Sequence, residues 1–271
     1  MTTPVEYEKR GKIGVITLNR PEARNAINGD VAAAFEAAID ALEGDDEVWV
    51  GVLRANTAGQ ERPVFCAGAD LKAINSGQAG SLNTARGGFA GFVYRERKKP
   101  VIAAVDGLAT AGGCEIVLST DLVVASTRSA FGLAEVLRNL VAGAGGLFRL
   151  PQLIGKNAAM EVILTGQPLT AQRAYELGMV NRLVEPDDVE AEAMALAETY
   201  INEGALTNKS YNDALDIAIA TLNNSDVLAS WNFKHIVNPD RMKGYNSVNL
   251  RLGYSMLDIK SPKELIRDGQ T

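Results

Sequence analysis

Short apolar runs alternate with helical patterns over the first two thirds of the chain. Four runs rich in Val, Ile, Leu and Ala predict strands: 13–18, 48–53, 101–105 and 122–125. Between the first two runs, apolar residues recur at helical spacing at Val31, Phe35, Ile39 and Leu42. Strands that alternate with helices indicate an α/β core whose sheet is covered by helices.

The pattern changes after about Pro151, where helix-forming residues dominate. Helical patterns are expected over 158–164, 171–177 and 187–221, and only 180–184 reads as a strand. Asn238-Pro239 predicts a helix restart, because proline favours a first-turn position, and the amphipathic tail runs on to about Ile259. We therefore expect a core over residues 1–200 and a helical C-terminal subdomain over 201–271.

The composition is that of a folded globular protein, with 46% hydrophobic and 22% charged residues. A formal net charge of −6 argues against a general nucleic-acid binder, which needs a basic face. No apolar run approaches the ~20 residues that span a bilayer, and the N-terminus lacks the apolar core of a secretory signal. Because Cys66 and Cys114 are too few for a disulfide framework, we expect a reducing, cytoplasmic setting.

The chain contains a single histidine, His235, which we interpret as a helix-face residue. A mechanism that requires several histidine ligands therefore has too few residues, and no metal site is expected. Carboxylates must then carry any acid–base chemistry.

Two turns of small residues each follow an apolar run, one in FCAGADLK (65–72) and one in ATAGGCE (109–115). Asp70 suits a helix N-cap, and Gly112 and Gly113 fall at the start of a predicted helix. Small side chains leave backbone N–H groups accessible, and a helix start favours an anion. Either turn alone more often only reverses the chain, but together the turns can converge on one oxygen.

Neither turn fits a common phosphate-binding loop, because no Lys-Ser/Thr pair follows the glycines. The stretch GAGGLFR (143–149) also lacks the third glycine of the dinucleotide-binding fingerprint, which disfavours a Rossmann cofactor site.

The turns, together with other motifs in the same order, resemble the crotonase superfamily, also called the enoyl-CoA hydratase/isomerase family. The similarity runs from about Ile13 to about Glu185 and is carried by seven segments: 14–26, 65–72, 99–115, 121–126, 129–135, 143–155 and 164–184. The resemblance implies a spiral of ββα units with a helical C-terminal subdomain used for trimerisation. Trimers of this family often pair into hexamers.

The resemblance also implies that the backbone N–H groups of Ala69 and Gly112 form an oxyanion hole for a thioester oxygen. It places substrate contacts around the first turn, at Arg24, Ala26, Ala67, Asp70, Leu71 and Lys72. Within this set, the Ala67 carbonyl faces the adenine, and Arg24 and Lys72 are placed to meet phosphates.

Hydratases of this family use two glutamates, and both matching positions, Glu115 and Glu135, are glutamate in this chain. Hydration needs one group to activate water for attack at the β-carbon and one to deliver a proton to the α-carbon. Burial among Leu133, Val136 and Ile116 would raise a glutamate's pKa toward neutral pH. The sequence leaves open which glutamate is the acid and which is the base.

Two segments depart from the family pattern. VLRNLVAGAGG (136–146) lacks the usual Gly-hydrophobic-x-Pro element, so the wall of the acyl pocket is expected to differ. In 238–254, Lys243 stands where an acid is expected and Ser247-Val248 replace Ala-Phe. Contacts from that segment to coenzyme A are therefore in doubt.

The leading interpretation is an enoyl-CoA hydratase of fatty-acid or related acyl-CoA breakdown, with no cofactor beyond the coenzyme A of its substrate. One alternative is another crotonase-type reaction: double-bond isomerisation, carnitinyl-CoA dehydration, or conversion of a steroid or aromatic acyl-CoA. A second alternative is a non-catalytic acyl-CoA-binding protein. The expected partners are an acyl-CoA and further copies of the chain, as a homotrimer or a dimer of trimers.

Overall fold

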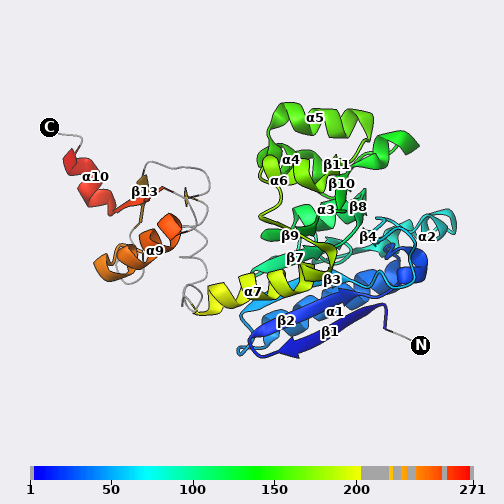
Figure 1. Cartoon of the computed structure of the whole chain (residues 1–271), viewed down its shortest axis with the longest axis horizontal. Helices are drawn as coiled ribbons and strands as arrows, with labels where there is room; N and C mark the ends of the chain where they lie inside the picture. The colour runs from blue at the N-terminus through cyan, green and yellow to red at the C-terminus, as the bar shows by residue number, and fades with distance from the viewer. Residues whose placement is uncertain (1–2, 203–219, 222–226, 231–235, 252–254, 269–271) are drawn as a thin grey trace. The chain divides into compact units, whose positions relative to one another are not determined.

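The computed structural model describes residues 3–202, 220–221, 227–230, 236–251 and 255–268 (Figure 1). Backbone contacts divide the chain into two compact units, Met1–Thr199 and Tyr200–Thr271. His235 and Tyr254 lie outside the described residues. In the part of the chain that is described, no helix has both the length and the hydrophobicity to cross a bilayer.

The larger sheet of the first unit has six strands in the order β1-β2-β3-β7-β9-β12. They are β1 (Val5–Arg10), β2 (Ile13–Leu18), β3 (Val50–Ala55), β7 (Val101–Val105), β9 (Leu122–Ser126) and β12 (Arg182–Val184). The β1–β2 pair is antiparallel, and the remaining neighbours are parallel. All six residues of β2 are buried, as expected for a strand covered on both faces. The four strands predicted from apolar runs are confirmed, with the second beginning at Val50.

A smaller four-stranded sheet has the order β11-β10-β8-β4. Its strands are β4 (Val64–Cys66), β8 (Leu108–Thr110), β10 (Ala130–Gly132) and β11 (Leu169–Thr170). Strand β8 pairs in parallel with both β4 and β10. The pairs β3/β4, β7/β8 and β9/β10 each place one strand in each sheet, and a helix or helical turn follows. This repeat is the ββα spiral expected from the resemblance. A two-stranded antiparallel ribbon, β5 (Asn83–Thr84) with β6 (Gly88–Phe89), completes the unit's sheets.

Helices pack on these sheets: α1 (Gly29–Gly44), α2 (Leu71–Asn75), α3 (Gly112–Leu118), α4 (Gly146–Ile154), α5 (Lys156–Thr165), α6 (Ala171–Glu176) and α7 (Val189–Asn202). All of them except α7 contribute residues to one apolar core. Short 3₁₀ turns are η1 (Pro21–Ala23), η2 (Ala79–Leu82), η3 (Ala134–Arg138) and η4 (Pro186–Asp188). Helix α1 is capped by the Asn28 side chain and buries the predicted apolar face, with Phe35 stacked on Phe92 at 4.7 Å. All seven residues of α3 are buried, so this helix runs through the core.

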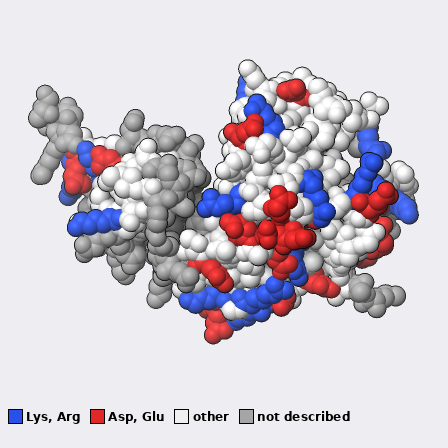
Figure 2. Space-filling model, viewed as in Figure 1, with Lys and Arg blue, Asp and Glu red and all other residues white. Residues whose placement is uncertain are grey.

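Charged side chains of both signs are interspersed on the face drawn in Figure 2. Several are paired across the strands of the large sheet and its edges. Lys9 contacts Asp45 and Glu47 at 2.8 and 2.7 Å, and Glu190 accepts from both Arg10 and Arg54.

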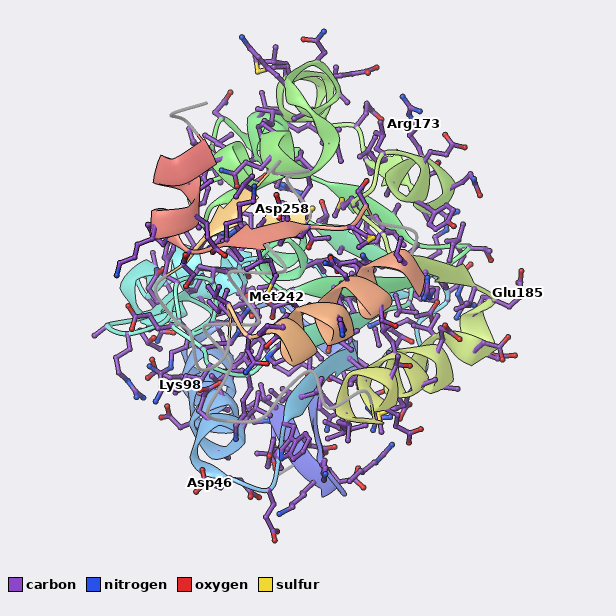
Figure 3. The ribbon with its side chains drawn as sticks, turned by 90° about the vertical axis from the view of Figure 1, so that its left-hand side faces the viewer. Asp46, Lys98, Arg173, Glu185, Met242 and Asp258 are labelled. Carbon is purple, nitrogen blue, oxygen red and sulfur yellow. The ribbon has the colours of Figure 1, made fainter. Side chains whose placement is uncertain are left out.

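The second unit contains α9 (Pro239–Arg251), α10 (Pro262–Asp268) and a parallel pair, β13 (Val227–Ala229) with β14 (Asp258–Lys260). Met242 of α9 and Asp258 of β14 are labelled in Figure 3. Among the described residues of the unit, Ala220, Ile236, Leu257 and Ile259 are buried together in a small core.

The predicted helix restart at Pro239 is confirmed, but the helical tail to Ile259 is wrong. Helix α9 ends at Arg251, and Ile259 lies in β14, where pairing with β13 buries it. Two strands therefore interrupt a region that we expected to be helical. Of the atypical segment, Lys243 and Ser247 are exposed on α9.

Candidate active site

The first turn follows β4 and is held by the backbone of residues 24–27. Ala67 N–H donates to the Arg24 carbonyl at 3.1 Å, and Ile27 N–H donates to the Gly68 carbonyl at 2.8 Å. Asp70 N–H in turn donates to the Ile27 carbonyl at 2.8 Å, which makes a parallel bridge between Ile27 and Ala69. This ladder uses the residues on either side of Ala69 and leaves the N–H of Ala69 outside it.

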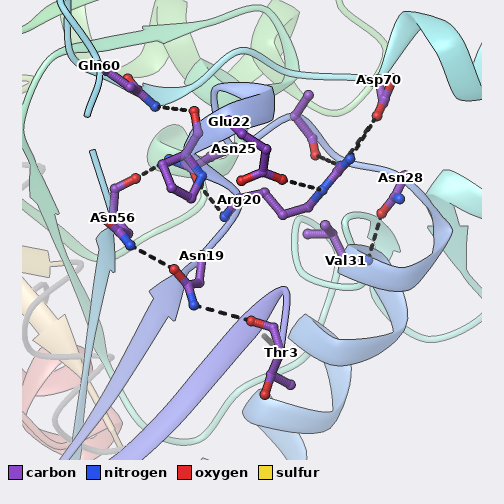
Figure 4. Close-up of polar contacts among 12 residues, drawn as sticks. Thr3, Asn19, Arg20, Glu22, Asn25, Asn28, Val31, Asn56, Gln60 and Asp70 are labelled. Atoms are coloured by element: carbon purple, nitrogen blue, oxygen red, sulfur yellow. Dashed lines mark hydrogen bonds and ion pairs between the residues drawn. The ribbon is translucent and has the colours of Figure 1, made fainter. Parts of the chain in front are cut away.

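A polar network centred on Arg20 and Asn25 supports this turn from behind (Figure 4). Arg20 Nη1 donates to the Ala26 carbonyl at 2.7 Å, and both Nη atoms lie 3.3 Å from Asp70 Oδ2. Asn25 Oδ1 accepts from Arg20 N–H at 2.9 Å, while Asn25 Nδ2 donates to the Asn56 carbonyl at 3.0 Å. The network fixes the segment that leaves β2 against the turn that leaves β4.

Asp70 connects the Arg20 network to the start of α2. Its Oδ1 accepts from Lys72 N–H at 3.0 Å and caps α2, as its N-cap prediction requires. Its Oδ2 faces Arg20, and its side chain is only 14% exposed. The sequence did not identify Arg20 and Asn25 as site residues, although both lie in the segment 14–26 that carries the family resemblance.

The second turn follows β8 and begins α3. Ala111 has φ 50° and ψ −129°, an unfavourable backbone region for a residue with a side chain. Its N–H donates to the Gly132 carbonyl at 2.9 Å and its carbonyl accepts from Glu115 N–H at 3.1 Å. Gly112 is the first helical residue, so its N–H has no acceptor within the helix.

The two turns lie against each other because β4 and β8 are neighbours in the small sheet. A Cβ at Gly68 would lie 2.9 Å from the Gly112 nitrogen, and one at Gly113 would lie 2.1 Å from the Cys66 carbonyl oxygen. A Cβ at Gly112 would lie 2.5 Å from the Phe89 ring. Glycine at these positions permits the close approach of two backbones. The convergence expected from the sequence is therefore present for the turns.

Glu115 lies on buried α3 and is 3% exposed. Its Oε1 accepts two backbone hydrogen bonds, from Ala144 N–H at 2.8 Å and from Gly146 N–H at 2.9 Å. Burial raises the pKa of Glu115, while these two N–H groups and the charge of Arg149 oppose the rise. The carboxyl is thus buried but held by groups that favour its ionised form.

Glu135 lies in η3 and differs from Glu115 in its surroundings. Its Oε2 is buried, and no described residue hydrogen-bonds to that atom. Burial raises the pKa of Glu135 to about 7; its own backbone N–H opposes the rise, and the negative charge of Glu115 adds to it. This coupling indicates that the two carboxyl groups lie near each other.

The residues expected to bury the glutamates are only partly in place. Ile116 and Leu133 are buried, whereas Val136 is 40% exposed, so its predicted role in burying a glutamate is wrong. Residue 136 sits in a 3₁₀ turn at the surface, where an apolar side chain does not ensure burial.

The residues expected to contact coenzyme A surround the first turn. The side chains of Arg24, Leu71 and Lys72 are exposed, while Ala67 is half-buried. Ala26 is buried, and its carbonyl accepts from Arg20. The contacts themselves remain a prediction.

Cys66 and Cys114 are free and fully buried beside the two turns, as expected for small core residues. Burial raises the pKa of Cys66 to about 12 and that of Cys114 still further, which keeps both thiols protonated. Among the described residues, no group of three His, Cys, Asp or Glu side chains is arranged to hold a metal ion.

The ββα spiral and the paired turns define a crotonase-type fold, and comparison with known proteins agrees. The sequence model of the Enoyl-CoA hydratase/isomerase family matches residues 8–247. The chain is 36% identical to a probable enoyl-CoA hydratase of Rhizobium meliloti over 79% of this chain and 82% of that protein. It is 36% identical to a carnitinyl-CoA dehydratase of Salmonella typhi over 76% of this chain and 77% of that protein.

A solved structure of an enoyl-CoA hydratase from Mycobacterium tuberculosis superposes with a TM-score of 0.73 at 36% identity. The match covers 96% of this chain and 99% of that one. The chain belongs to the enoyl-CoA hydratase/isomerase family.

Proposed function

We propose that the protein is an enoyl-CoA hydratase, which adds water reversibly to a trans-2-enoyl-CoA and gives a 3-hydroxyacyl-CoA. The observation that carries the proposal is an electrostatically coupled pair of carboxyls, the buried Glu115 and the half-buried Glu135, on a chain of this family. Hydration is the reaction that needs both a base for water and an acid for carbon.

The two turns supply the electrostatic part of the mechanism. When water attacks the β-carbon, negative charge develops on the thioester oxygen, which the N–H groups of Ala69 and Gly112 would stabilise. Preorganised donors of this kind contribute roughly 3–4 kcal/mol each to the lowering of a barrier. The Arg20 network and the β4–β8 pairing hold these donors in place before the substrate arrives.

The surroundings of the glutamates support different roles. Glu115 receives two N–H groups that favour its ionised form, so it takes the proton from water as the oxygen bonds to the β-carbon. Glu135, with a pKa of about 7, has a substantial protonated fraction at neutral pH, and in that form it delivers its proton to the α-carbon. The addition leaves one proton on Glu115 in place of the one on Glu135, and dehydration runs the same transfers in reverse.

Coenzyme A belongs to the substrate, and the proposed mechanism uses no further cofactor. Arg24 and Lys72 are exposed beside the first turn and are suited to meet its phosphates, with the Ala67 carbonyl facing the adenine. The Ala26, Asp70 and Leu71 positions complete the wall of this path. Asp70 also holds Arg20 and the start of α2 in place.

The direct test is hydration of crotonyl-CoA, followed by the loss of absorbance of the conjugated thioester. The proposal expects turnover by the purified protein. A protein that binds crotonyl-CoA but hydrates no 2-enoyl-CoA in a panel of short, long, branched and aromatic acyl chains would contradict it and favour a non-catalytic acyl-CoA-binding protein.

Dehydration of carnitinyl-CoA is the second candidate, because the chain is as similar to the Salmonella protein of that name as to the Rhizobium hydratase. Both reactions move water across the same pair of carbons and would use the same two glutamates. The ratio of kcat/KM for crotonyl-CoA and for carnitinyl-CoA separates the two candidates.

We further propose a homotrimer, or a dimer of trimers, assembled through residues 201–271, in a reducing cytoplasm. The family resemblance supports the assembly, and the two buried free thiols suit a reducing compartment. Light scattering on the purified chain would give the mass of three or six copies.

A further inference from the structure

The position of Glu115 depends on the loop that precedes α4 as well as on its own helix. The N–H groups that hold its carboxylate belong to Ala144 and Gly146. Between them Gly145 has φ +109°, a left-handed conformation that a residue with a side chain rarely adopts. Whatever fixes residues 143–146 therefore also fixes the carboxylate.

Arg149 lies directly on this loop. Its Nη1 donates to the Ala144 carbonyl at 3.1 Å, and its Nη2 donates to the Val93 carbonyl at 2.5 Å. A Cβ at Gly145 would lie 2.0 Å from Arg149 Nη1, so the guanidinium fills the space next to that glycine. One planar group thus joins the loop to the segment that follows β6.

Aromatic rings hold the guanidinium in this place. Its Cζ lies 4.9 Å from the Phe148 ring centroid and 5.5 Å from that of Tyr94. Tyr94 also donates from Oη to the Gly143 carbonyl at 3.1 Å. The loop is therefore clamped at two carbonyls, Gly143 by Tyr94 and Ala144 by Arg149.

The same segment reaches the second turn. Phe89, five residues before Tyr94, packs its ring against Gly112, where a Cβ would lie 2.5 Å from the ring. Residues 89–94 thus contact the backbone of both the oxyanion donor and the loop that holds Glu115. A displacement of the Gly112 backbone would therefore be transmitted through residues 89–94 to the loop that holds Glu115, and the reverse also holds.

We propose that Arg149 is a positioning residue that aligns Glu115 for water activation by clamping residues 143–146 to the backbone of residue 93. This inference rests on the hydratase function proposed above. Arg149 acts through the amide groups of Ala144 and Gly146, and touches neither substrate nor the reacting atoms.

Arg97 offers a matched control. Its Nη2 donates to the Ser119 carbonyl at 2.8 Å, and its Cζ lies 4.7 Å from the Phe92 ring. It therefore makes the same kinds of contact as Arg149, a backbone carbonyl and an aromatic face, at the C-terminal end of α3, and it also pairs with Asp121 at 3.2 Å. Arg97→Met removes these contacts and none of the hydrogen bonds to residues 143–146.

The test compares Arg149→Met with Arg97→Met in hydration of crotonyl-CoA by the full-length protein. We expect Arg149→Met to lower kcat by about 100-fold and to change KM by less than about threefold, since misplacement of a catalytic group affects the chemical step. Added guanidinium ion should restore part of the kcat of Arg149→Met alone. An unchanged kcat, a loss without rescue, or an equal loss in Arg97→Met would overturn the proposal.

The pH profile provides a second readout. The charged groups that act on Glu115 are Arg149 of α4 and Glu135 of η3. Removing the Arg149 charge and loosening the two N–H bonds both favour the protonated form of Glu115, so the acid limb of kcat/KM should move to higher pH. A merely structural role would leave that limb in place.

Tyr94→Phe keeps the proposal testable if Arg149→Met does not fold. Tyr94 is 48% exposed, so the variant removes one hydrogen bond to the loop at little risk to the fold. We expect a loss in kcat of about threefold, in the range of one neutral hydrogen bond. Wild-type kcat in Tyr94→Phe would overturn the clamp, whereas a wild-type protein without hydratase activity would instead contradict the proposed function.

Discussion

Glu115 and Glu135 are the same residue type in two different settings. The carboxylate of Glu115 is held by two N–H groups of a neighbouring loop, whereas Oε2 of Glu135 is buried without a hydrogen-bond partner among the described residues. Burial raises the pKa of both, and a neighbouring loop opposes the rise only at Glu115. The difference teaches that the base and the acid of one reaction can be set by backbone donors rather than by residue type.

Removing Glu135, the proposed acid, should have the largest effect. Glu135→Gln keeps the shape of the side chain but cannot deliver a proton, so we expect kcat for crotonyl-CoA hydration to fall by about 1,000-fold. Binding of a coenzyme A thioester, measured by calorimetry, should stay within about threefold, because the turns and the cationic residues are untouched. A variant that retains more than a tenth of wild-type kcat would break the comparison, since Glu135 would then not be the acid.

A smaller effect should follow from displacing Glu115, the proposed base. A Cβ at Gly146 would lie 3.1 Å from Glu115 Oε1 and 2.9 Å from Leu133, so Gly146→Ala should push the carboxylate aside. We expect kcat to fall by about 10- to 100-fold with the fold retained.

Gly143→Ala is the control in the same loop, because the nearest atom to its added Cβ is the Val141 carbonyl oxygen at 3.8 Å. Its kcat should stay within about twofold of wild type. Equal losses of kcat in the two variants would mean that the conformation of the whole loop, rather than its contact with Glu115, sets the rate.

The smallest expected effect is on stability. Because the pKa of Glu135 is raised from 4.5 to about 7, the folded protein binds more protons at this site than the unfolded chain between these pH values. Stability therefore falls as pH rises through this window. With allowance for partial exposure, the ionised group costs about 2 kcal/mol at pH 8.

Glu135→Gln removes this cost, so its Tm should exceed that of wild type by more at pH 8 than at pH 5. Thermal unfolding of both proteins across this range measures the gap. Glu161→Gln, which neutralises an exposed carboxylate on α5, should show no such widening. If the Tm difference between Glu135→Gln and wild type were the same at pH 5 and pH 8, the Glu135 carboxyl would behave like an exposed one.

Much of the first unit could be predicted from the sequence because its strands are short apolar runs between turn residues. The second unit was harder, since β14 is a three-residue strand whose apolar member, Ile259, also fits a helical pattern. Such a strand is defined by its pairing with β13, which lies about thirty residues earlier. Local patterns do not contain that information.

The candidate site likewise contains residues that the sequence identified and residues that only the folded structure shows. The turns carry a sequence signal because their small residues are visible within one segment each, and both glutamates were identified through the family resemblance. Arg20 and Arg149 were not identified, because each acts on backbone carbonyls that any residue supplies. Val93 is 56 residues from Arg149 and has no chemical feature that marks it as a partner. Residues of this kind require the folded structure.

The most direct test of the account is the pH dependence of kcat/KM for hydration of crotonyl-CoA and for dehydration of its product. The two directions use tautomers of one singly protonated pair, so both should show the same bell-shaped profile. The high-pH limb should fall with an apparent pKa of about 7, and Glu135→Gln should lose that limb. A rate that stays constant through pH 7 in wild type, or a limb that persists in Glu135→Gln, would contradict Glu135 as the group that holds the proton.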